Sequence, residues 1–290
     1  MTELRERKME RVQASQRDAA TTVQRLPSLW AASAARISAE LKAAFRDWQS
    51  MLFNMALPAL MMIVFGSVFK GKIQGTNVDY RVMFIAGMIA VGVMSACFQT
   101  LAIGVTLDRD EGLIRRLAAS PMMRPAYFVG IMVKTLVMTL LEVVIIVGLG
   151  VVLYNLPIPT DPARWLTLAW VILLGVSSCS LAGIAYTAVI PNARAAAAAA
   201  TPPFMILQLI PGVFFPLAMI PAVMKYIAYV FPLAWMAKGL RYVFLPDSLV
   251  SNEPGGSWEL DRVALMLLAW TIGGLVLSAL TFKWRGQRVK

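Results

Sequence analysis

Histidine is absent from the 290 residues, and cysteine occurs only twice. Without histidine the chain has no imidazole for acid–base catalysis and no histidine-ligated metal. Cys97 and Cys179 both lie inside apolar runs, which fits small packing residues and argues against a disulfide framework or a thiolate metal site. We therefore expect no catalytic residue, no metal site and no cofactor bound by this chain.

Acidic residues are also few, because 16 Asp and Glu stand against 27 Lys and Arg, for a formal net charge of +11. The basic residues sit beside long apolar runs instead of forming a water-facing surface. An anionic membrane leaflet is therefore a better partner for them than nucleic acid. Hydrophobic residues make up 59% of the chain, which is typical of an integral membrane protein.

Six apolar stretches are long enough to cross about 30 Å of hydrocarbon. We expect an all-α polytopic membrane protein with transmembrane helices at residues 51–69, 82–107, 126–154, 165–190, 195–215 and 263–282. Residues 28–49 place apolar side chains three or four positions apart with charges between them, which predicts an amphipathic interfacial helix, with a soluble core helix as the alternative. Prolines and basic residues interrupt residues 216–245, so a re-entrant helical segment is expected before the last span.

The two ends of the chain are polar. Residues 1–27 are charged and lack an apolar period, so we expect a disordered cytoplasmic tail, and residues 286–290 form the cytoplasmic C-terminus. No apolar stretch of the kind found in cleaved signal peptides precedes Met51. With both termini in the cytoplasm, more Lys and Arg flank the cytoplasmic ends of the spans than the outer ends, as the positive-inside rule requires.

The loop after the second span reads LDRDEGLIRRLAASPMMRPAYFVG. Leu113, Ile114 and Leu117 fall on one side of a helix, and a short helix within residues 108–120 should end before the Ser-Pro pair. A short helix with an apolar tip and charged flanks suits docking into the groove of a partner protein. A connector resting on the membrane surface is the alternative.

Residues 66–72 read GSVFKGK and match the first seven positions of a phosphate-binding loop. Ile73 stands where that motif needs a magnesium-binding hydroxyl, and the stretch ends a membrane span instead of joining a strand to a helix. The match is therefore fortuitous. If this protein uses ATP, another chain hydrolyses it.

Glu142 lies near the middle of the third predicted span, where an ionisable group is costly and usually functional. Lys134 is roughly 12 Å away along the same helix, too far to pair with it directly. We hypothesise that Glu142 faces a wet path and attracts cationic amphipathic substrates, the alternative being a protonated carboxyl bonded between helices. The other predicted path or gate residues are Gln208, Phe214 and Phe215, for which helix packing and an aromatic belt are the alternatives.

The run DRDEGLIRRLAASPMMRPAYFVG resembles the signature loop of ABC-2 type permeases, the membrane subunits of ATP-binding-cassette (ABC) exporters. In that loop an acidic-Gly-x-x-x-Arg-Leu-x-x-(Ser/Thr)-Pro pattern precedes the third span. A second similarity lies in PGVFFPLAMIP and YVFPLAWMAKGLR, before the last span. The resemblance covers residues 28–285 and is closest to the daunorubicin/doxorubicin-resistance permease type, with polysaccharide or teichoic-acid exporter permeases as the main alternative.

The resemblance implies a function and a set of partners. The implied protein is the permease subunit of an ATP-driven exporter that moves hydrophobic or amphipathic drugs, antibiotics or lipids out across the bacterial plasma membrane, and it is not itself an enzyme. Its partners would be two copies of a separate ATPase that binds ATP and Mg, a second or sister permease, and the lipid membrane, with no nucleic acid. The residues placed on or beside the helix that contacts the ATPase are Glu111, Gly112, Leu113, Ile114, Arg116 and Leu117. A non-transporting scaffold for an ATPase and a lipid-modifying membrane enzyme are the alternative functions.

Overall fold

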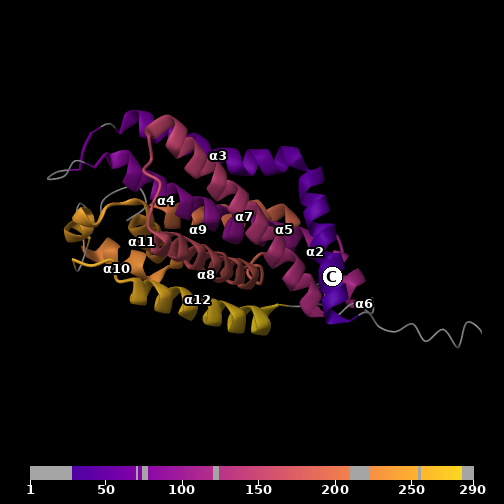
Figure 1. Cartoon of the computed structure of the whole chain (residues 1–290). Coiled ribbons are helices and arrows are strands. Elements are labelled where there is room, and N and C mark those ends of the chain that lie inside the picture. Colours follow the sequence, from indigo (N-terminus) through magenta and orange to yellow (C-terminus); the bar gives the residue numbers. More distant parts are fainter. Residues whose placement is uncertain are drawn as a thin grey trace, which may run out of the picture.

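The computed structural model describes residues 28–69, 71–73, 78–119, 124–209, 222–253 and 256–282. Within these ranges the regular elements are helices, and the described residues add one isolated β-bridge, between Lys72 and Asp79. This confirms the all-α prediction (Figure 1). Five helices of the described ranges are long and apolar enough to cross a membrane: Trp48–Val68, Tyr80–Asp110, Pro125–Tyr154, Pro162–Tyr186 and Leu260–Thr281. The chain is therefore a multi-pass membrane protein.

The first two described helices are α2 (Leu29–Arg46) and α3 (Trp48–Val68), and α2 crosses one end of the bundle at a steep angle to α3 (Figure 1). Asp47 separates them, and its carboxylate caps α3 by accepting a hydrogen bond from the Ser50 amide at 3.4 Å. The predicted interfacial helix extended to residue 49, whereas α2 ends at Arg46. Trp48 begins the first span instead, because the cap at Asp47 starts a new helix.

The second span consists of α4 (Tyr80–Met94), a π-helical turn η1 (Ser95–Thr100) and α5 (Leu101–Asp110), which follow one another without a break. It is the most enclosed of the five spans, since 83% of its most apolar window is buried. All of α4 from Phe84 to Met94 is buried. A π-turn inside a helix is uncommon and often marks a functional site.

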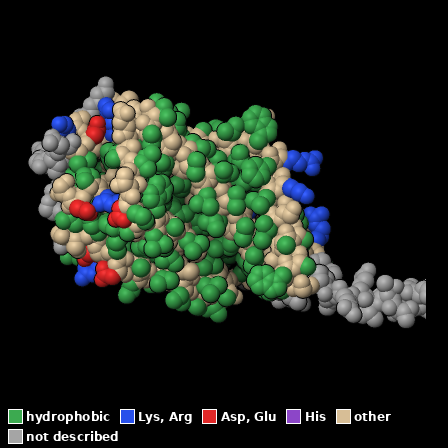
Figure 2. Space-filling model, viewed as in Figure 1, with side chains coloured by type: hydrophobic (Ala, Val, Ile, Leu, Met, Phe, Trp, Pro, Cys, Tyr) green, Lys and Arg blue, Asp and Glu red, His purple; other side chains and the backbone are tan. Residues whose placement is uncertain are grey.

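The remaining described spans are α7 (Arg124–Tyr154), α8 (Pro162–Tyr186) and α12 (Leu260–Thr281). The α7 and α8 helices contact the second span, and α12 packs on α8. Only 28% and 22% of the most apolar windows of α7 and α12 are buried, so most of their side chains face outward. The face seen in Figure 2 is hydrophobic across the middle of the bundle, and charged side chains gather toward its two ends. This is the distribution expected of a protein whose middle lies in hydrocarbon.

The α9 helix (Ala193–Leu209) covers the first part of the predicted fifth span, and residues 210–215 of that span lie outside the described residues. Two hydrogen bonds hold α9 to its neighbours. The Gln99 amide nitrogen donates to the Thr201 hydroxyl at 2.8 Å, and the Tyr186 hydroxyl donates to the Ala199 carbonyl at 3.0 Å. The π-turn and the end of α8 therefore share α9 as a common support.

The segment before the last span forms two short helices, α10 (Ala222–Val230) and α11 (Pro232–Phe244), followed by the 3-10 helix η3 (Asp247–Asn252). Every residue of α11 except Tyr242 is buried, because α11 packs against α4, α8 and α12. The predicted re-entrant segment began at residue 216, and residues 216–221 lie outside the described part.

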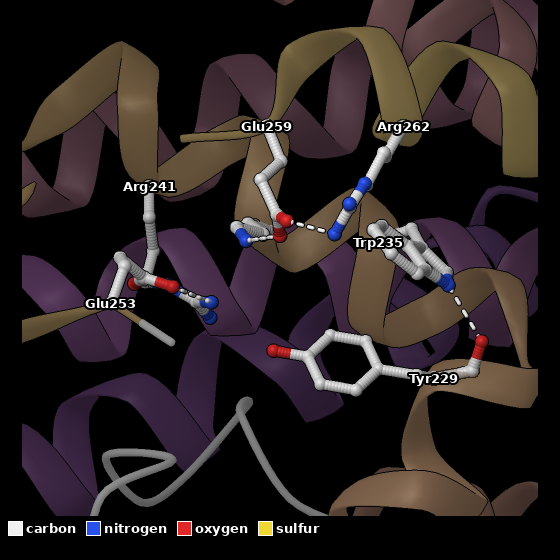
Figure 3. Close-up of polar contacts among 7 residues, drawn as sticks. Tyr229, Trp235, Arg241, Glu253, Glu259 and Arg262 are labelled. Carbon is white, nitrogen blue, oxygen red and sulfur yellow. Dashed lines mark hydrogen bonds and ion pairs between the residues drawn. The ribbon is translucent and has the colours of Figure 1, made fainter. Parts of the chain in front are cut away.

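The burial of α11 includes two basic side chains, each of which has an acidic partner from the following loop. Arg241 is 1% exposed and contacts Glu253 through two hydrogen bonds, from Nε at 2.6 Å and from a terminal nitrogen at 3.0 Å. Lys238 pairs with Glu259, which also pairs with Arg262 (Figure 3). These acids make burial of the bases tolerable, since an isolated buried charge is very costly.

Candidate functional site

The loop predicted to bind a partner lies at the end of the bundle that α2 crosses, opposite α10 and α11 (Figure 1). Its helix, α6 (Leu113–Ala119), is shorter than the predicted 108–120, because residues 108–110 continue α5. Glu111 and Gly112 form the turn between the two helices, and Gly112 has φ of 76°, a left-handed conformation that favours glycine. The Arg116 guanidinium reaches back to the Glu111 carbonyl at 3.4 Å.

The two sides of α6 differ in what they contact. Ile114 is 1% exposed and packs with a cluster from α5, α7 and α8 that includes Tyr127, and Leu117 packs against the same cluster. The side chains of Glu111, Arg115 and Arg116 are exposed. The sequence suggested an apolar tip offered to a partner, whereas the structure turns that tip into the bundle and presents charged residues outward. Ile114 therefore anchors α6.

Residues just before this turn tie it to the α8–α9 connection, which the sequence did not predict. The Arg109 guanidinium donates to the carbonyls of Thr187 at 3.0 Å and Ile190 at 2.7 Å. The Asp110 carboxylate accepts a hydrogen bond from the Ala193 amide at 2.5 Å. These charge-assisted bonds fix the end of the second span to the α8–α9 connection and to the start of α9.

A second group of contacts joins α2 to α7 and α5. The Glu40 carboxylate on α2 accepts hydrogen bonds from Arg36 on the same helix and from Lys134 on α7, the latter at 2.7 Å. The Arg36 guanidinium lies 5.2 Å from the centre of the Tyr127 ring, and the Tyr127 hydroxyl donates to Asp108 at 3.0 Å. The α2 helix is therefore held to the bundle by polar contacts as well as by packing.

A cavity of about 630 Å³ opens between α2, α3, the π-turn, α5 and α7. Its size is within the range of small-molecule sites. Glu142 lies in its wall about two turns further along α7 than Lys134, and is 3% exposed. Its Oε1 atom has no hydrogen-bond partner among the described residues. Gly92 on α4 makes room for this carboxylate, because a Cβ atom at position 92 would lie 2.6 Å from Oε1.

Comparison with known proteins identifies the chain. The family model of the ABC-2 type transporter matches residues 34–245, from α2 to the end of α11. The chain belongs to the ABC-2 type transporter family. It is therefore a transmembrane permease component of an ABC transporter that is not itself catalytic, and the family implies an ATPase subunit as its partner. No curated protein matches the permease.

Of the other path or gate residues predicted for the permease, the structure describes Gln208. Gln208 is half-buried on α9 and does not line the described wall of the cavity. Phe214 and Phe215 lie outside the described residues, so the aromatic outer gate stays a prediction. The cavity around Glu142 is formed largely by α2, α3 and α7. The sequence did not predict that these helices meet there.

Replacing Glu40 by Gln is expected to lower the stability of the purified permease by about 2 kcal/mol, because Arg36 and Lys134 would lose their shared negative partner while remaining largely enclosed. Thermal unfolding in detergent measures the effect. Replacing the half-buried Asp79, whose contact with Arg81 is 3.7 Å long, by Asn is the matched control and should change stability much less. Equal shifts for the two variants would contradict a structural role for Glu40.

Proposed function

We propose that this chain is the permease subunit of an ATP-driven exporter that moves hydrophobic or amphipathic molecules, such as drugs, antibiotics or lipids, out across the bacterial plasma membrane. It would work with two copies of a separate ATPase, which bind ATP and Mg, and with a second or sister permease. The proposal is supported above all by the two sides of α6. The outer side is charged and exposed, and the inner side packs against α5, α7 and α8.

The orientation follows from the same end of the molecule. Lys and Arg side chains gather at the α2 end of the face in Figure 2, and basic residues favour the cytoplasmic side of a membrane. We therefore place α2, α6 and both termini in the cytoplasm, where an ATPase would reach α6. The α10–α11 end would then face outward.

The proposed coupling proceeds by rigid-body movement. Closure of the ATPase dimer on ATP would push α6 through Glu111, Arg115 and Arg116. Ile114 is buried in the bundle, and Arg109 is hydrogen-bonded to the α8–α9 connection. The spans would therefore move with α6 as rigid bodies, and the loop would not deform by itself. Movements of packed helices about an interface are an established means of transmitting such a signal.

Replacing Arg115 by Glu is expected to reduce the amount of ATPase that co-purifies with the permease by at least about tenfold, because a reversed charge in an interface costs several kcal/mol. Arg115 is exposed, so its replacement should leave the fold intact. Leu117 is less suitable for this test because it packs against the permease's own cluster. The measurement is affinity purification from native membranes in mild detergent, with quantification of the ATPase by mass spectrometry.

The matched control for Arg115→Glu is Lys42→Glu, which reverses an exposed charge on α2 and should leave the complex unchanged. Normal assembly of the Arg115 variant would overturn the assignment of α6 as the contact surface. A complex that assembles but whose ATP hydrolysis never responds to any exported compound would instead favour the scaffold function over transport.

A further inference from the structure

The charge of the cavity differs from that of the chain. The chain as a whole has a formal charge of +11, but four acidic side chains and only two basic ones lie in the described lining of the cavity. A site lined by an excess of one charge concentrates ligands of the opposite charge. The cavity therefore favours a cation over an anion or a neutral molecule.

Three of the four acids already have a local role. Glu40 holds two bases, Asp108 accepts the hydrogen bond of Tyr127, and Asp47 caps α3 at an exposed position. Glu142 is the exception among the described lining acids, because its Oε1 atom is buried without a partner. An ionised carboxylate in the middle of a span is very costly unless a positive charge pairs with it.

The approach to Glu142 is restricted to one side. Gly92 leaves just enough space for the carboxylate, so α4 closes the cavity behind it. The exposed residues of the lining lie on α2, on α3 and in the π-turn, among them Ala39, Asn54 and Thr100, so the cavity is open on this side. A ligand would reach Glu142 from there.

The rest of the wall suits an apolar body. It includes the flexible side chains Met51, Met55 and Met138 together with the aliphatic Leu101, Val105 and Ile131. Methionine adapts to irregular apolar shapes. The described lining contains no aromatic ring, so a cation would have to be recognised by a carboxylate and not by an aromatic cage.

We propose that this cavity binds a compact monovalent organic cation, with its charged centre beside Glu142 and its apolar body against the methionine and aliphatic side chains. Binding itself requires no ATPase. The claim that the bound cation is a transported substrate rests on the proposed exporter function.

The test uses the purified full-length permease alone, in a neutral detergent, with tetraphenylphosphonium as the probe. Tetraphenylborate has nearly the same shape and the opposite charge, so it is the matched control ligand. Equilibrium dialysis should show tetraphenylphosphonium bound with a defined stoichiometry and tetraphenylborate not bound. Glu142→Gln should weaken binding of the cation by at least about tenfold, because it removes a charge-assisted contact at a buried position.

The control variant is Asp161→Asn, which removes an exposed acid outside the cavity lining while keeping a residue that can cap α8. It should change the affinity by less than about twofold, since an exposed charge is largely screened. Unchanged affinity in Glu142→Gln, or equal binding of the two probe ions, would overturn the proposal.

Two further results separate related questions. Competition by a short-chain phosphatidylcholine would identify a lipid headgroup as a source of the bound cation, whereas failure to compete would point to free amphipathic cations, and both outcomes require the same site. If the permease binds the cation but no ATPase, the exporter function fails and the cation site stands. If it binds an ATPase but not the cation, the cation site fails and the exporter function stands.

Discussion

Replacing Glu253 by Gln should destabilise the permease by about 3–5 kcal/mol, more than any other single neutralisation proposed for this chain. Gln keeps the shape of the side chain but removes the negative charge that faces Arg241, which is 1% exposed. The guanidinium would stay in the bundle without the carboxylate that balances it. The loss is measured as a lower thermal unfolding midpoint of the purified protein in detergent.

Two variants show whether the effect is due to the buried pair. Asp261→Asn removes an exposed acid from the first turn of α12 and should cost only about 0.5 kcal/mol. Combining Glu253→Leu with Arg241→Met replaces the pair by apolar side chains and should recover most of the stability, because such replacements are often neutral. If Glu253→Gln unfolds at the same temperature as Asp261→Asn, the pair is not needed for holding α11 in place.

Replacing Gly183 by Leu should cost about 3 kcal/mol and weaken the response of the ATPase to substrate in the reconstituted complex. A Cβ atom at this position of α8 would lie 2.9 Å from the Phe98 carbonyl oxygen and 3.0 Å from that of Cys97. Both are backbone atoms of the π-turn and cannot rotate away. The two helices must therefore separate, and Thr187, one turn further along, would move away from Arg109.

The matched control for Gly183→Leu is Gly148→Leu on α7, since no atom lies within 4 Å of the position its Cβ would occupy. This change should be neutral or slightly stabilising, because leucine favours the helical conformation more than glycine does. Unfolding midpoints of both variants, measured with the ATP hydrolysis of the reconstituted complexes, provide the comparison. Similar midpoints would show that α8 is not closely packed on the π-turn.

The sequence predicted those features that depend on local pattern. Apolar length located the spans, and the Ser-Pro pair at residues 120 and 121 predicted that the loop helix stops before it, where α6 is described up to Ala119. Glu142 was recognisable because an ionisable residue interrupts an otherwise apolar run. These inferences need only neighbouring residues.

Features that depend on which helices meet were not predictable. Glu40 and Lys134 are 94 positions apart, and no pattern in either helix indicates the other. The direction of Ile114 was ambiguous for a different reason, because a partner's groove and the permease's own bundle would bury an apolar side chain equally well. The π-turn also left no signal, since its residues resemble those of the α-helix around it.

The π-turn sets the rotational phase between the two halves of the second span. A π-turn contains one residue more than an α-turn, and one residue corresponds to about 100° of rotation about the helix axis. If the residues from Ser95 to Thr100 closed into ordinary α-turns, the part of the span that follows would rotate by about 100° and turn Arg109 away from Thr187 and Ile190, even though every side chain were kept. The direction in which the loop end of this span faces is thus encoded in the backbone of the π-turn.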